Sequence, residues 1–354
     1  MMTFTRKAHL ILFTMMMITT ISLAQKPHRV GTTAANFLEI GIGSAGNSMG
    51  EAYVSMAGDL SCIYWNPAGL AFLEKNEALF MYQPWIADIH TIFVGVGLVR
   101  APYGTFSLGL FNLDYGDIEV TNMMMQEGTG EMYSANDLSF SLAYSRMITD
   151  WFAFGAAAKY ISSQIWHTSA NALAVDLGVI VNTHFFTLTG DRSDGLRIGM
   201  SISNYGTRLR FDGMDLLTGI DLLPDEQGNY SDVPGQFKMQ EWELPLIFRI
   251  GMSVNPLVSR YHRLTLALDA LHPNNNSESI NAGFQYQFKA PSFGSFYLRG
   301  GYKALFMNQS EYGLTLGGGI ALRFMRNAGV KMDYAYKTLG ILGDTQSYTI
   351  GISF

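Results

Sequence analysis

Cysteine, charge and long apolar runs are all scarce in this chain of 354 residues. Cys62 is the single cysteine, which excludes an intramolecular disulfide framework and a cysteine-based zinc cluster. Charged residues make up 15% of the sequence, against roughly 25% in a typical soluble domain. The net charge of −6 gives no basic footprint for nucleic acid, so we expect no nucleic-acid partner. After residue 24, no segment has the ~20 consecutive apolar residues of a membrane-spanning helix.

Motifs for catalysis and metal binding are also missing. The seven histidines are scattered without HxH or HExxH spacing, and no GxSxG elbow occurs. Residues 190–195 faintly resemble a calcium loop but lack its closing glutamate. Gly41, Gly43 and Gly46 match GxGxxG, but no strand–helix–strand unit surrounds them. We therefore expect no enzyme, no metal site and no cofactor.

Glycine and aromatic residues are abundant instead. The chain has 37 glycines, and its aromatic fraction is 13%. With a hydrophobic fraction of 48%, this composition excludes intrinsic disorder and argues against a helical bundle. It is typical of a β-rich chain whose surface tolerates apolar atoms.

The first 24 residues have the pattern of a secretory signal peptide. Arg6 and Lys7 form a charged start, an apolar stretch follows, and Ser22-Leu23-Ala24 is a small-x-small cleavage site. A membrane anchor helix is the alternative, but the apolar stretch is short of the ~20 residues that a span needs. We predict cleavage after Ala24.

Beyond residue 75, apolar residues alternate with small or polar ones in segments of about ten residues. In the last segment, every second residue from Tyr348 to Phe354 is apolar, with threonine, glycine and serine between. This period of two indicates strands with one apolar face. We predict fourteen strands, at 77–83, 90–100, 103–113, 137–149, 151–162, 171–182, 196–205, 244–254, 261–271, 278–289, 293–304, 311–324, 328–336 and 345–354.

The connections between these segments alternate in length. Those after even-numbered strands are mostly tight, and those after odd-numbered strands are mostly long, notably 114–136 and 206–243. Two connections break the rule: 163–170 is short and 183–195 is long. Outer-membrane barrels show such alternation. A soluble β-sandwich is the alternative, but a chain with a continuous apolar face in nearly every strand must close its sheet in lipid.

The sequence therefore predicts an all-β fold, a fourteen-stranded antiparallel transmembrane barrel over residues 76–354. Charged residues on the polar faces of the strands would then point into the lumen, as a network of paired charges and water or as a solute path. These lumen-facing candidates are Arg249, Asp269, Arg299, Lys303, Arg323, Lys331 and Asp333.

Residues 31–72 do not alternate. They are rich in glycine, and Trp65-Asn66-Pro67-Ala68-Gly69 forms a compact turn. Eight strands fill a barrel with side chains and sixteen leave a channel, so fourteen need something inside. We expect residues 25–75 to be a hatch in the lumen; the alternative is a periplasmic tail below the barrel.

Several blocks of this sequence resemble the PorV/PorQ family, which belongs among the FadL-like fourteen-stranded barrels. The blocks are residues 31–43, 48–54 and 64–71, with the Asn-Pro-Ala turn of the hatch at Asn66, Pro67 and Ala68, and later 268–274, Glu278, Asn281 and 333–336. The resemblance covers essentially the whole chain after the signal peptide.

The resemblance implies an outer-membrane component of the type IX secretion system. PorV-like members associate with the large translocon and the surface attachment machinery, and they receive cargo through its C-terminal signal domain. PorQ-like members hold a surface partner instead. The Tyr-Trp pair before Asn66 is closer to PorV, but loops 114–136 and 206–243 have no clear match, so both roles stay open.

These two loops carry apolar and aromatic residues suited to an interface. The candidates for partner binding are Met123, Met124, Met125, Tyr133, Phe211, Leu216, Leu217, Tyr230 and Trp242. The alternative for the second loop is that it folds over the barrel mouth.

Two functions compete. The first is an interaction protein that docks cargo and partners with its outer loops; the second is a FadL-like transporter of hydrophobic small molecules, with a lipid or detergent molecule in the lumen. A transporter needs a contiguous apolar pocket under the hatch. The predicted inward residues are mainly polar, which favours the first function, although Phe93, Ile247 and Tyr297 also point inward.

Overall fold

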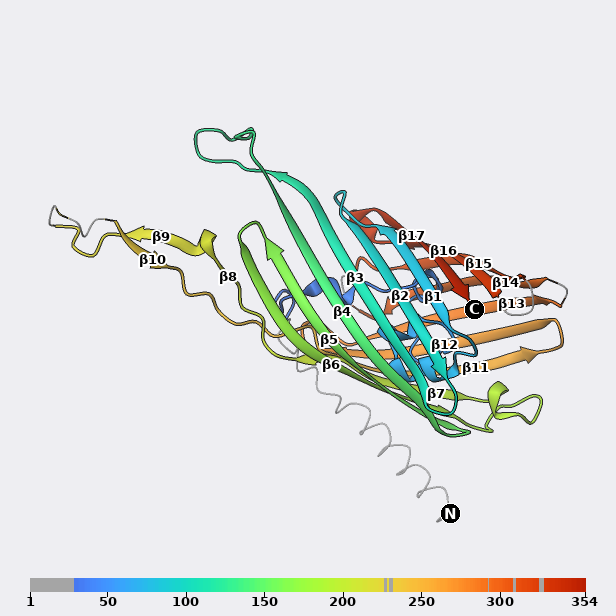
Figure 1. Cartoon of the computed structure of the whole chain (residues 1–354). Coiled ribbons are helices and arrows are strands. Elements are labelled where there is room, and N and C mark those ends of the chain that lie inside the picture. Colours follow the sequence, from blue (N-terminus) through green and yellow to red (C-terminus); the bar gives the residue numbers. More distant parts are fainter. Residues whose placement is uncertain (1–28, 226–227, 229–231, 292, 308–309, 325–327) are drawn as a thin grey trace, which may run out of the picture.

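The computed structural model describes residues 29–225, 228, 232–291, 293–307, 310–324 and 328–354. The predicted signal peptide and its cleavage site at Ala24 lie outside these residues. In the described ranges the chain is mostly β-structure, with short helical turns near the start (Figure 1).

Most of the strands are ten or more residues long. They are β1 (Glu77–Pro84), β2 (His90–Arg100), β3 (Gly104–Glu119), β4 (Met132–Thr149), β5 (Phe152–Ile165), β6 (Thr168–Asn182), β7 (Arg197–Gly206), β8 (Asp212–Gly213), β9 (Leu217–Ile220), β10 (Val233–Gln236), β11 (Ile247–Val258), β12 (His262–Pro273), β13 (Ser279–Ala290), β14 (Gly294–Leu305), β15 (Leu314–Phe324), β16 (Ala328–Thr338) and β17 (Asp344–Ser353). The short helices are η1 (Asn36–Glu39), α2 (Ser44–Ser48), α3 (Cys62–Trp65), η2 (Pro67–Phe72), η3 (Arg192–Asp194), η4 (Met214–Leu216) and η5 (Gly340–Leu342).

Fourteen of these strands close into one antiparallel barrel. Strands β1 to β7 pair in sequence order, and so do strands β11 to β17. Two pairings join the halves, β7 with β11 and β1 with β17. Strand β8 adds a short bridge at one end of β6, and β9 pairs with β10 as a separate hairpin. The predicted fourteen-stranded barrel is confirmed.

Side chains along each barrel strand alternate between an exposed apolar face and a buried face. In β17, the outward Ile350 and Ile352 are 45% and 49% exposed. The inward Ser347 and Thr349 of the same strand are buried. Because an outer-membrane barrel presents an apolar band to the hydrocarbon, the outward face is the lipid-facing surface.

The two ends of the barrel differ in their connections. Short turns such as 101–103 and 259–261 lie at one end, and the long connections 120–131 and 207–246 lie at the other (Figure 1). Outer-membrane barrels have short periplasmic turns and longer extracellular loops, which orients the molecule. The β6–β7 connection, residues 183–196, is a long exception at the periplasmic end.

Both long extracellular loops contain more regular structure than the sequence predicted. Strands β3 and β4 continue past an irregularity at Asp114–Asp117, so the loop expected at 114–136 shrinks to 120–131. The loop expected at 206–243 contains β8, η4, β9 and β10. The β9–β10 hairpin has no buried face, so its sequence lacks the alternation by which strands are recognised.

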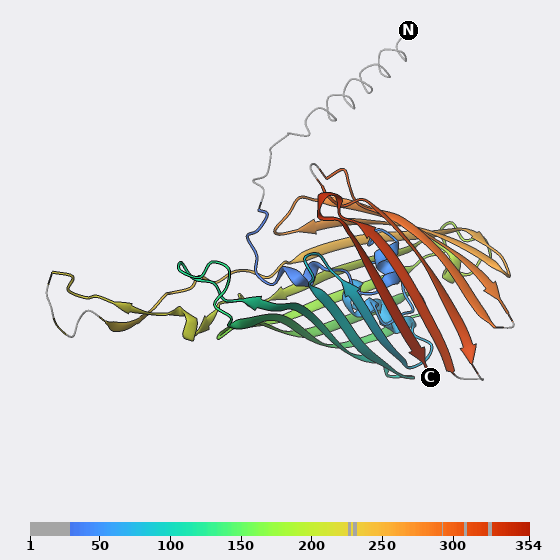
Figure 2. The ribbon, with the colours of Figure 1, turned by 90° about the horizontal axis from the view of Figure 1, so that it is seen from above.

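The described chain begins at the extracellular mouth and reaches the periplasmic end before β1 starts. The Ala34 amide donates to the Glu243 carbonyl oxygen at 2.9 Å, within the 207–246 connection. The Phe354 amide donates to the Asn76 carbonyl oxygen at 2.9 Å, next to the start of β1. Between these points the blue turns lie inside the ring of strands (Figure 2).

None of the helices in the described ranges combines the length and the apolar character of a membrane span.

Candidate functional site

Residues 34–73, here called the luminal segment, pack against the inward faces of the barrel strands. Helix α2 contacts β14 to β17 on one side of the barrel, and η2 contacts β3 to β6 on the other. Met49, Leu60 and Leu70 are fully buried. A chain segment with so few regular hydrogen bonds of its own must bond to the barrel wall, and the contacts below show how it does so.

Glycines on the inward strand faces let the backbone of the luminal segment approach the wall. A Cβ atom added at Gly283 of β13 would lie 2.2 Å from the Met49 carbonyl oxygen. One added at Gly301 of β14 would lie 2.3 Å from the Met49 carbonyl carbon, and one at Gly199 of β7 would lie 2.3 Å from the Val54 carbonyl oxygen. No side chain fits at these separations, so the glycine content of the strands partly reflects this close contact.

The Asn66-Pro67 turn is held by hydrogen bonds to two different parts of the molecule. Asn66 Nδ2 donates to the carbonyl oxygen of Val54 at 2.8 Å and to that of Val179 in β6 at 3.1 Å. Asn66 Oδ1 accepts from the Ala68 amide at 3.1 Å and so caps η2, while Pro67 occupies the first position of that helix. The turn therefore joins the luminal segment to the barrel wall.

Trp65 fills the centre of the luminal segment. Its side chain is 1% exposed, and its Nε1 donates to the Ile42 carbonyl oxygen at 2.8 Å. Cβ atoms added at Gly41 and Gly46 would lie within 2.9 and 2.6 Å of the indole, so both glycines make room for the ring. All five residues of the predicted hatch motif, Trp65, Asn66, Pro67, Ala68 and Gly69, are buried.

Glu51 of the luminal segment lies between two lysines of the barrel. Its carboxylate is 2.8 Å from Lys303 Nζ in β14 and 2.9 Å from Lys337 Nζ in β16. Burial raises the pKa of Glu51, but Lys303 and Lys337 lower it by more, and the result is a pKa of about 2. The carboxylate is therefore ionised at neutral pH and neutralises part of the positive charge in the lumen.

Asp59 forms a second charged contact. It accepts from Lys331 Nζ of β16 at 3.2 Å and from the Tyr53 hydroxyl at 2.5 Å. Lys331 also lies 3.4 Å from Asp333, which in turn pairs with Arg299 at 2.6 Å. Burial raises the pKa of Asp59, but Lys331 and two hydroxyl donors bring it down to about 2.

The remaining lumen-facing candidates make separate contacts. Asp269 is buried and accepts from the Val54 amide at 2.8 Å. Arg249 is buried, donates to Ser203 Oγ at 2.9 Å and lies over the Tyr64 ring. Arg323 shares the inward side of β15 but is exposed at its periplasmic end.

Several residues of this network escaped the sequence analysis. Glu51 and Asp59 stand in a glycine-rich stretch without periodicity, so their orientation could not be read from a pattern. Lys337 lies one residue beyond the predicted strand 328–336 and continues its inward row. Lys159 and Asp176 form a buried pair at 2.6 Å on β5 and β6, and their inward positions were detectable from strand alternation.

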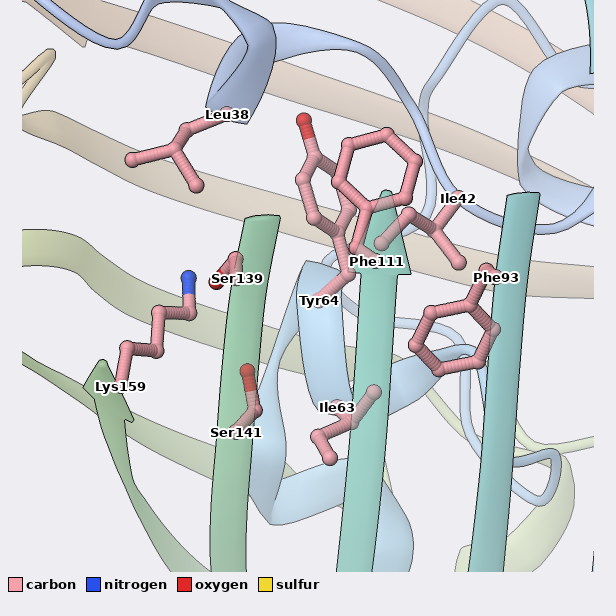
Figure 3. Close-up of a pocket in the computed structure, with 9 residues that line it drawn as sticks. All are labelled: Leu38, Ile42, Ile63, Tyr64, Phe93, Phe111, Ser139, Ser141 and Lys159. Carbon is pink, nitrogen blue, oxygen red and sulfur yellow. The ribbon is translucent and has the colours of Figure 1, made fainter. Parts of the chain in front are cut away.

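A small cavity lies between the luminal segment and strands β2 to β5 (Figure 3). Its apolar lining includes Leu38, Phe93 and Phe111, and Lys159 reaches its edge with Ser139. The cavity volume is about 20 Å³. A single water needs roughly 10–15 Å³ on the same measure, so the cavity is the size of one water rather than of a hydrocarbon ligand.

The long connection 207–246 has a packed base and a projecting arm, here defined as residues 214–225, 228 and 232–239 (Figure 1). At the base, the backbones of Leu209 and Trp242 exchange hydrogen bonds of 2.8 and 2.9 Å, and Leu209 is buried. Phe211 packs partly against the core, whereas Trp242 is 44% exposed. Within the arm, Leu217 is 56% exposed.

Three other loop residues were candidates for partner binding. Leu216 is half-buried at the start of the arm, and Tyr230 lies outside the described residues. Tyr133 was predicted to lie in the loop 114–136, but it stands in β4 and packs against Trp166 at a ring separation of 5.8 Å. The extension of β4 beyond its predicted start accounts for this difference.

The methionine tip of the 120–131 loop is held open to solvent. Met123 and Met124 are each 95% exposed, and Met125 is 52% exposed. Asn122 Oδ1 accepts from the amides of Met124 and Met125 at 2.9 and 2.7 Å, which shapes the turn. Methionine side chains adapt to irregular apolar surfaces, so this tip is suited to protein contact.

Among the described residues, no three His, Cys, Asp or Glu side chains gather in a way that could hold a metal ion.

Comparison with known proteins supplies a family and a set of structural relatives. A family model described as "Type IX secretion system protein PorV" matches residues 23–218, more than half of the chain. No curated protein matches the sequence.

The structural relatives include three transport barrels. The toluene transporter TodX of Pseudomonas putida has a TM-score of 0.54 at 10% identity, over 88% of this chain and 97% of that chain. CymD, described as a monoaromatic hydrocarbon channel, has a TM-score of 0.54 at 12% identity, over 89% and 98%. The Ralstonia pickettii toluene transporter TbuX has a TM-score of 0.52 at 11% identity, over 88% and 97%. At these identities the likeness shows a shared fold alone.

Proposed function

The chain belongs to the PorV family of type IX secretion system proteins, and from this premise we propose that it docks secretion partners through its extracellular loops. Its fold and family are those of Gram-negative outer-membrane proteins concerned with transport. The partners proposed are the translocon, the surface attachment proteins and the C-terminal signal domains of cargo. Removal of the signal peptide near Ala24 remains a prediction.

The observation that carries this proposal is the contrast between a filled lumen and projecting loops. Residues 34–73 occupy the lumen, and the cavity beside them has a volume of about 20 Å³. Outside, Met123 and Met124 are almost fully exposed. Large exposed apolar side chains are characteristic of interaction sites, whereas a solute path needs open volume.

We also propose that residues 25–75 act as the hatch of the barrel. The salt bridges of Glu51 and Asp59 and the glycine contacts around Met49 and Val54 support this role. A segment bonded to both sides of the barrel wall can seal it and stiffen the rim that presents the loops.

The test of docking removes the arm without disturbing the barrel. The Phe237 amide donates to the Leu216 carbonyl oxygen at 3.0 Å, so residues 217–236 can be replaced by a two-residue Asn-Gly turn. The packed base at Leu209 and Trp242 is retained. Tagged protein is then purified from detergent-solubilised membranes, and its partners are identified by mass spectrometry.

We expect partner recovery to fall by about tenfold or more, which corresponds to a loss of ~1.4 kcal/mol of binding free energy. Heat-modifiable migration on gels confirms that the shortened barrel still folds. Undiminished recovery of every partner would count against docking by the arm. A second variant shortens the other loop, replacing 122–128 by a short turn, and so separates the contributions of the two loops.

A FadL-like transporter of hydrophobic small molecules is the second candidate. The structural relatives favour it, because they are described as toluene transporters and a hydrocarbon channel. The cavity at Phe93 and Phe111 has an apolar lining, as such a transporter requires, but its volume of about 20 Å³ is too small for a hydrocarbon ligand. Uptake of a long-chain fatty acid into a strain lacking its own importer tests this candidate, and absence of uptake would eliminate it.

A further inference from the structure

The β6–β7 connection, residues 183–196, exposes three large apolar side chains at the periplasmic end. Phe185 is 70% exposed, Phe186 is 76% exposed and Leu188 is 59% exposed. The neighbouring connections at this end are tight turns. The greater length of the β6–β7 connection is therefore not needed to join two adjacent strands. Exposed apolar side chains clustered in one loop indicate an interaction surface.

Hydrogen bonds and a salt bridge hold this loop in a defined conformation. Thr183 and Leu196 are joined by two bonds, from the Thr183 amide and hydroxyl to the Leu196 carbonyl oxygen at 3.0 and 2.9 Å. The Thr187 hydroxyl donates to the Asp191 carbonyl oxygen at 3.0 Å. Asp194 is buried and forms a salt bridge with Arg263 of β12, which ties the loop to a strand beyond β7 and β11.

The exposed residue Phe186 also adopts an unfavourable backbone conformation. Its φ angle is +59°, in the left-handed region that bulky side chains rarely adopt. A strained backbone persists only where the surrounding structure enforces it, and such positions concentrate at functional sites. The loop therefore holds an unfavourable conformation while its aromatic ring stays in the open.

The exposed side chains stand next to the lipid-facing surface of the adjoining strands. Phe185 follows the end of β6 at Asn182, and among the outward residues of that strand Leu177 is 44% exposed. On the adjoining strand β7, the outward Met200 is 40% exposed. The Leu196 amide donates to the Phe185 carbonyl oxygen at 2.7 Å, which holds Phe185 close to the start of β7.

We propose that this loop inserts into the membrane interface beside the barrel, in the inner, phospholipid leaflet of the outer membrane. Phe185, Phe186 and Leu188 would enter the boundary between headgroups and acyl chains, as apolar side chains of interfacial segments do. Arg192, whose Nε donates to His184 Nε2 at 2.7 Å, lies in the same loop and is available to phospholipid phosphates. The position of the loop directly next to the lipid-facing strands β6 and β7 favours lipid over a periplasmic protein as the occupant.

Site-directed spin labelling tests this proposal, because Cys62 is buried and is the chain's single cysteine. A nitroxide is attached to Phe185→Cys or Leu188→Cys, and the full-length protein is reconstituted into phosphatidylethanolamine and phosphatidylglycerol vesicles. Collision with oxygen, which concentrates in lipid, is compared with collision with a water-soluble nickel chelate. Leu177→Cys is the lipid-facing control, and Met124→Cys is the water-exposed control.

The proposal expects the oxygen-to-nickel accessibility ratio at 185 and 188 to be several-fold above that at 124 and to approach that at 177. Ratios at both positions equal to that at 124 would overturn it and would indicate a surface facing the periplasm or a protein there. If one variant fails to insert, as judged by heat-modifiable migration, the other carries the test. The outcome does not depend on the role of the arm in secretion.

Discussion

Glu51 and Lys303, 252 positions apart in the sequence, form a salt bridge of 2.8 Å inside the barrel. Lys337 reaches the same carboxylate from β16. One residue of the luminal segment thus contacts two strands of the wall and neutralises part of the positive charge that they bring into the lumen.

Glu51→Gln tests this contact. The substitution leaves Lys303 and Lys337 buried without a counter-charge, and removing one partner of a buried pair typically costs about 3–5 kcal/mol. We expect a clear fall in the urea concentration at the midpoint of unfolding. Unfolding is measured by heat-modifiable migration on gels. The matched control is Glu127→Gln in an exposed loop, for which we expect a change within about 0.5 kcal/mol. Equal midpoints for the two variants would mean that the bridge contributes little.

The glycine contacts give a second prediction. Gly301→Ala forces a Cβ to within 2.3 Å of the Met49 backbone, whereas a Cβ at Gly318, on the outward side of β15, would meet its nearest neighbour at 3.5 Å. Overpacking costs about 1–3 kcal/mol, so Gly301→Ala should lower the unfolding midpoint and Gly318→Ala should not. A luminal segment that packs loosely in the membrane would give two indistinguishable variants.

Asn66→Ala tests the hydrogen bonds of the Asn-Pro turn without altering its charge. The carbonyl oxygens of Val54 and Val179 lose their donor, and η2 loses its cap. Leaving buried polar groups unpaired costs about 1–3 kcal/mol, so protease cleavage within residues 34–73 should become faster while the barrel strands stay protected. Asn276→Ala, in an exposed turn, is the control and should leave the cleavage rate unchanged.

Acid should release the luminal segment only at very low pH. The pKa values of Glu51 and Asp59 lie near 2, below their ordinary values of 4.5 and 3.8. Groups with a lowered folded-state pKa stabilise the fold above the ordinary value and lose this contribution as pH falls through the folded value. The unfolding midpoint should therefore decline between about pH 4.5 and pH 2, and the decline should shrink in Glu51→Gln. An unchanged pH profile in that variant would contradict the assignment.

The barrel could be predicted from the sequence because each strand repeats the same two-residue pattern. Strand β2 runs from His90 to Arg100, as predicted, and the other barrel strands lie within a few residues of their predicted bounds, except where β3 and β4 extend into the predicted loop. The PorV/PorQ family was predicted from motifs such as Trp65-Asn66-Pro67, and the match to the PorV family model confirms it.

For the charged contacts in the lumen, only the partner on the barrel wall could be predicted from the sequence. Lys303, Lys331 and Asp333 follow from strand alternation, but alternation says nothing about which group each meets. Glu51 and Asp59 lie in irregular structure, and their partners are more than 250 residues away, so only the closed barrel brings them together. Similarly, the β9–β10 hairpin has no buried face and leaves no pattern in the sequence.

The most direct test of the account fixes the luminal segment to the wall and measures secretion. Ser44 Oγ lies 2.8 Å from Thr349 Oγ1 of β17, so Ser44→Cys with Thr349→Cys places two sulfurs where a bond of about 2.05 Å can form. In a strain lacking its own copy of the protein, the amount of cargo at the cell surface is compared with the disulfide oxidised and reduced. Docking by the loops predicts equal secretion in both states. Loss of secretion on oxidation with recovery on reduction would show that the luminal segment must move, and would contradict the account.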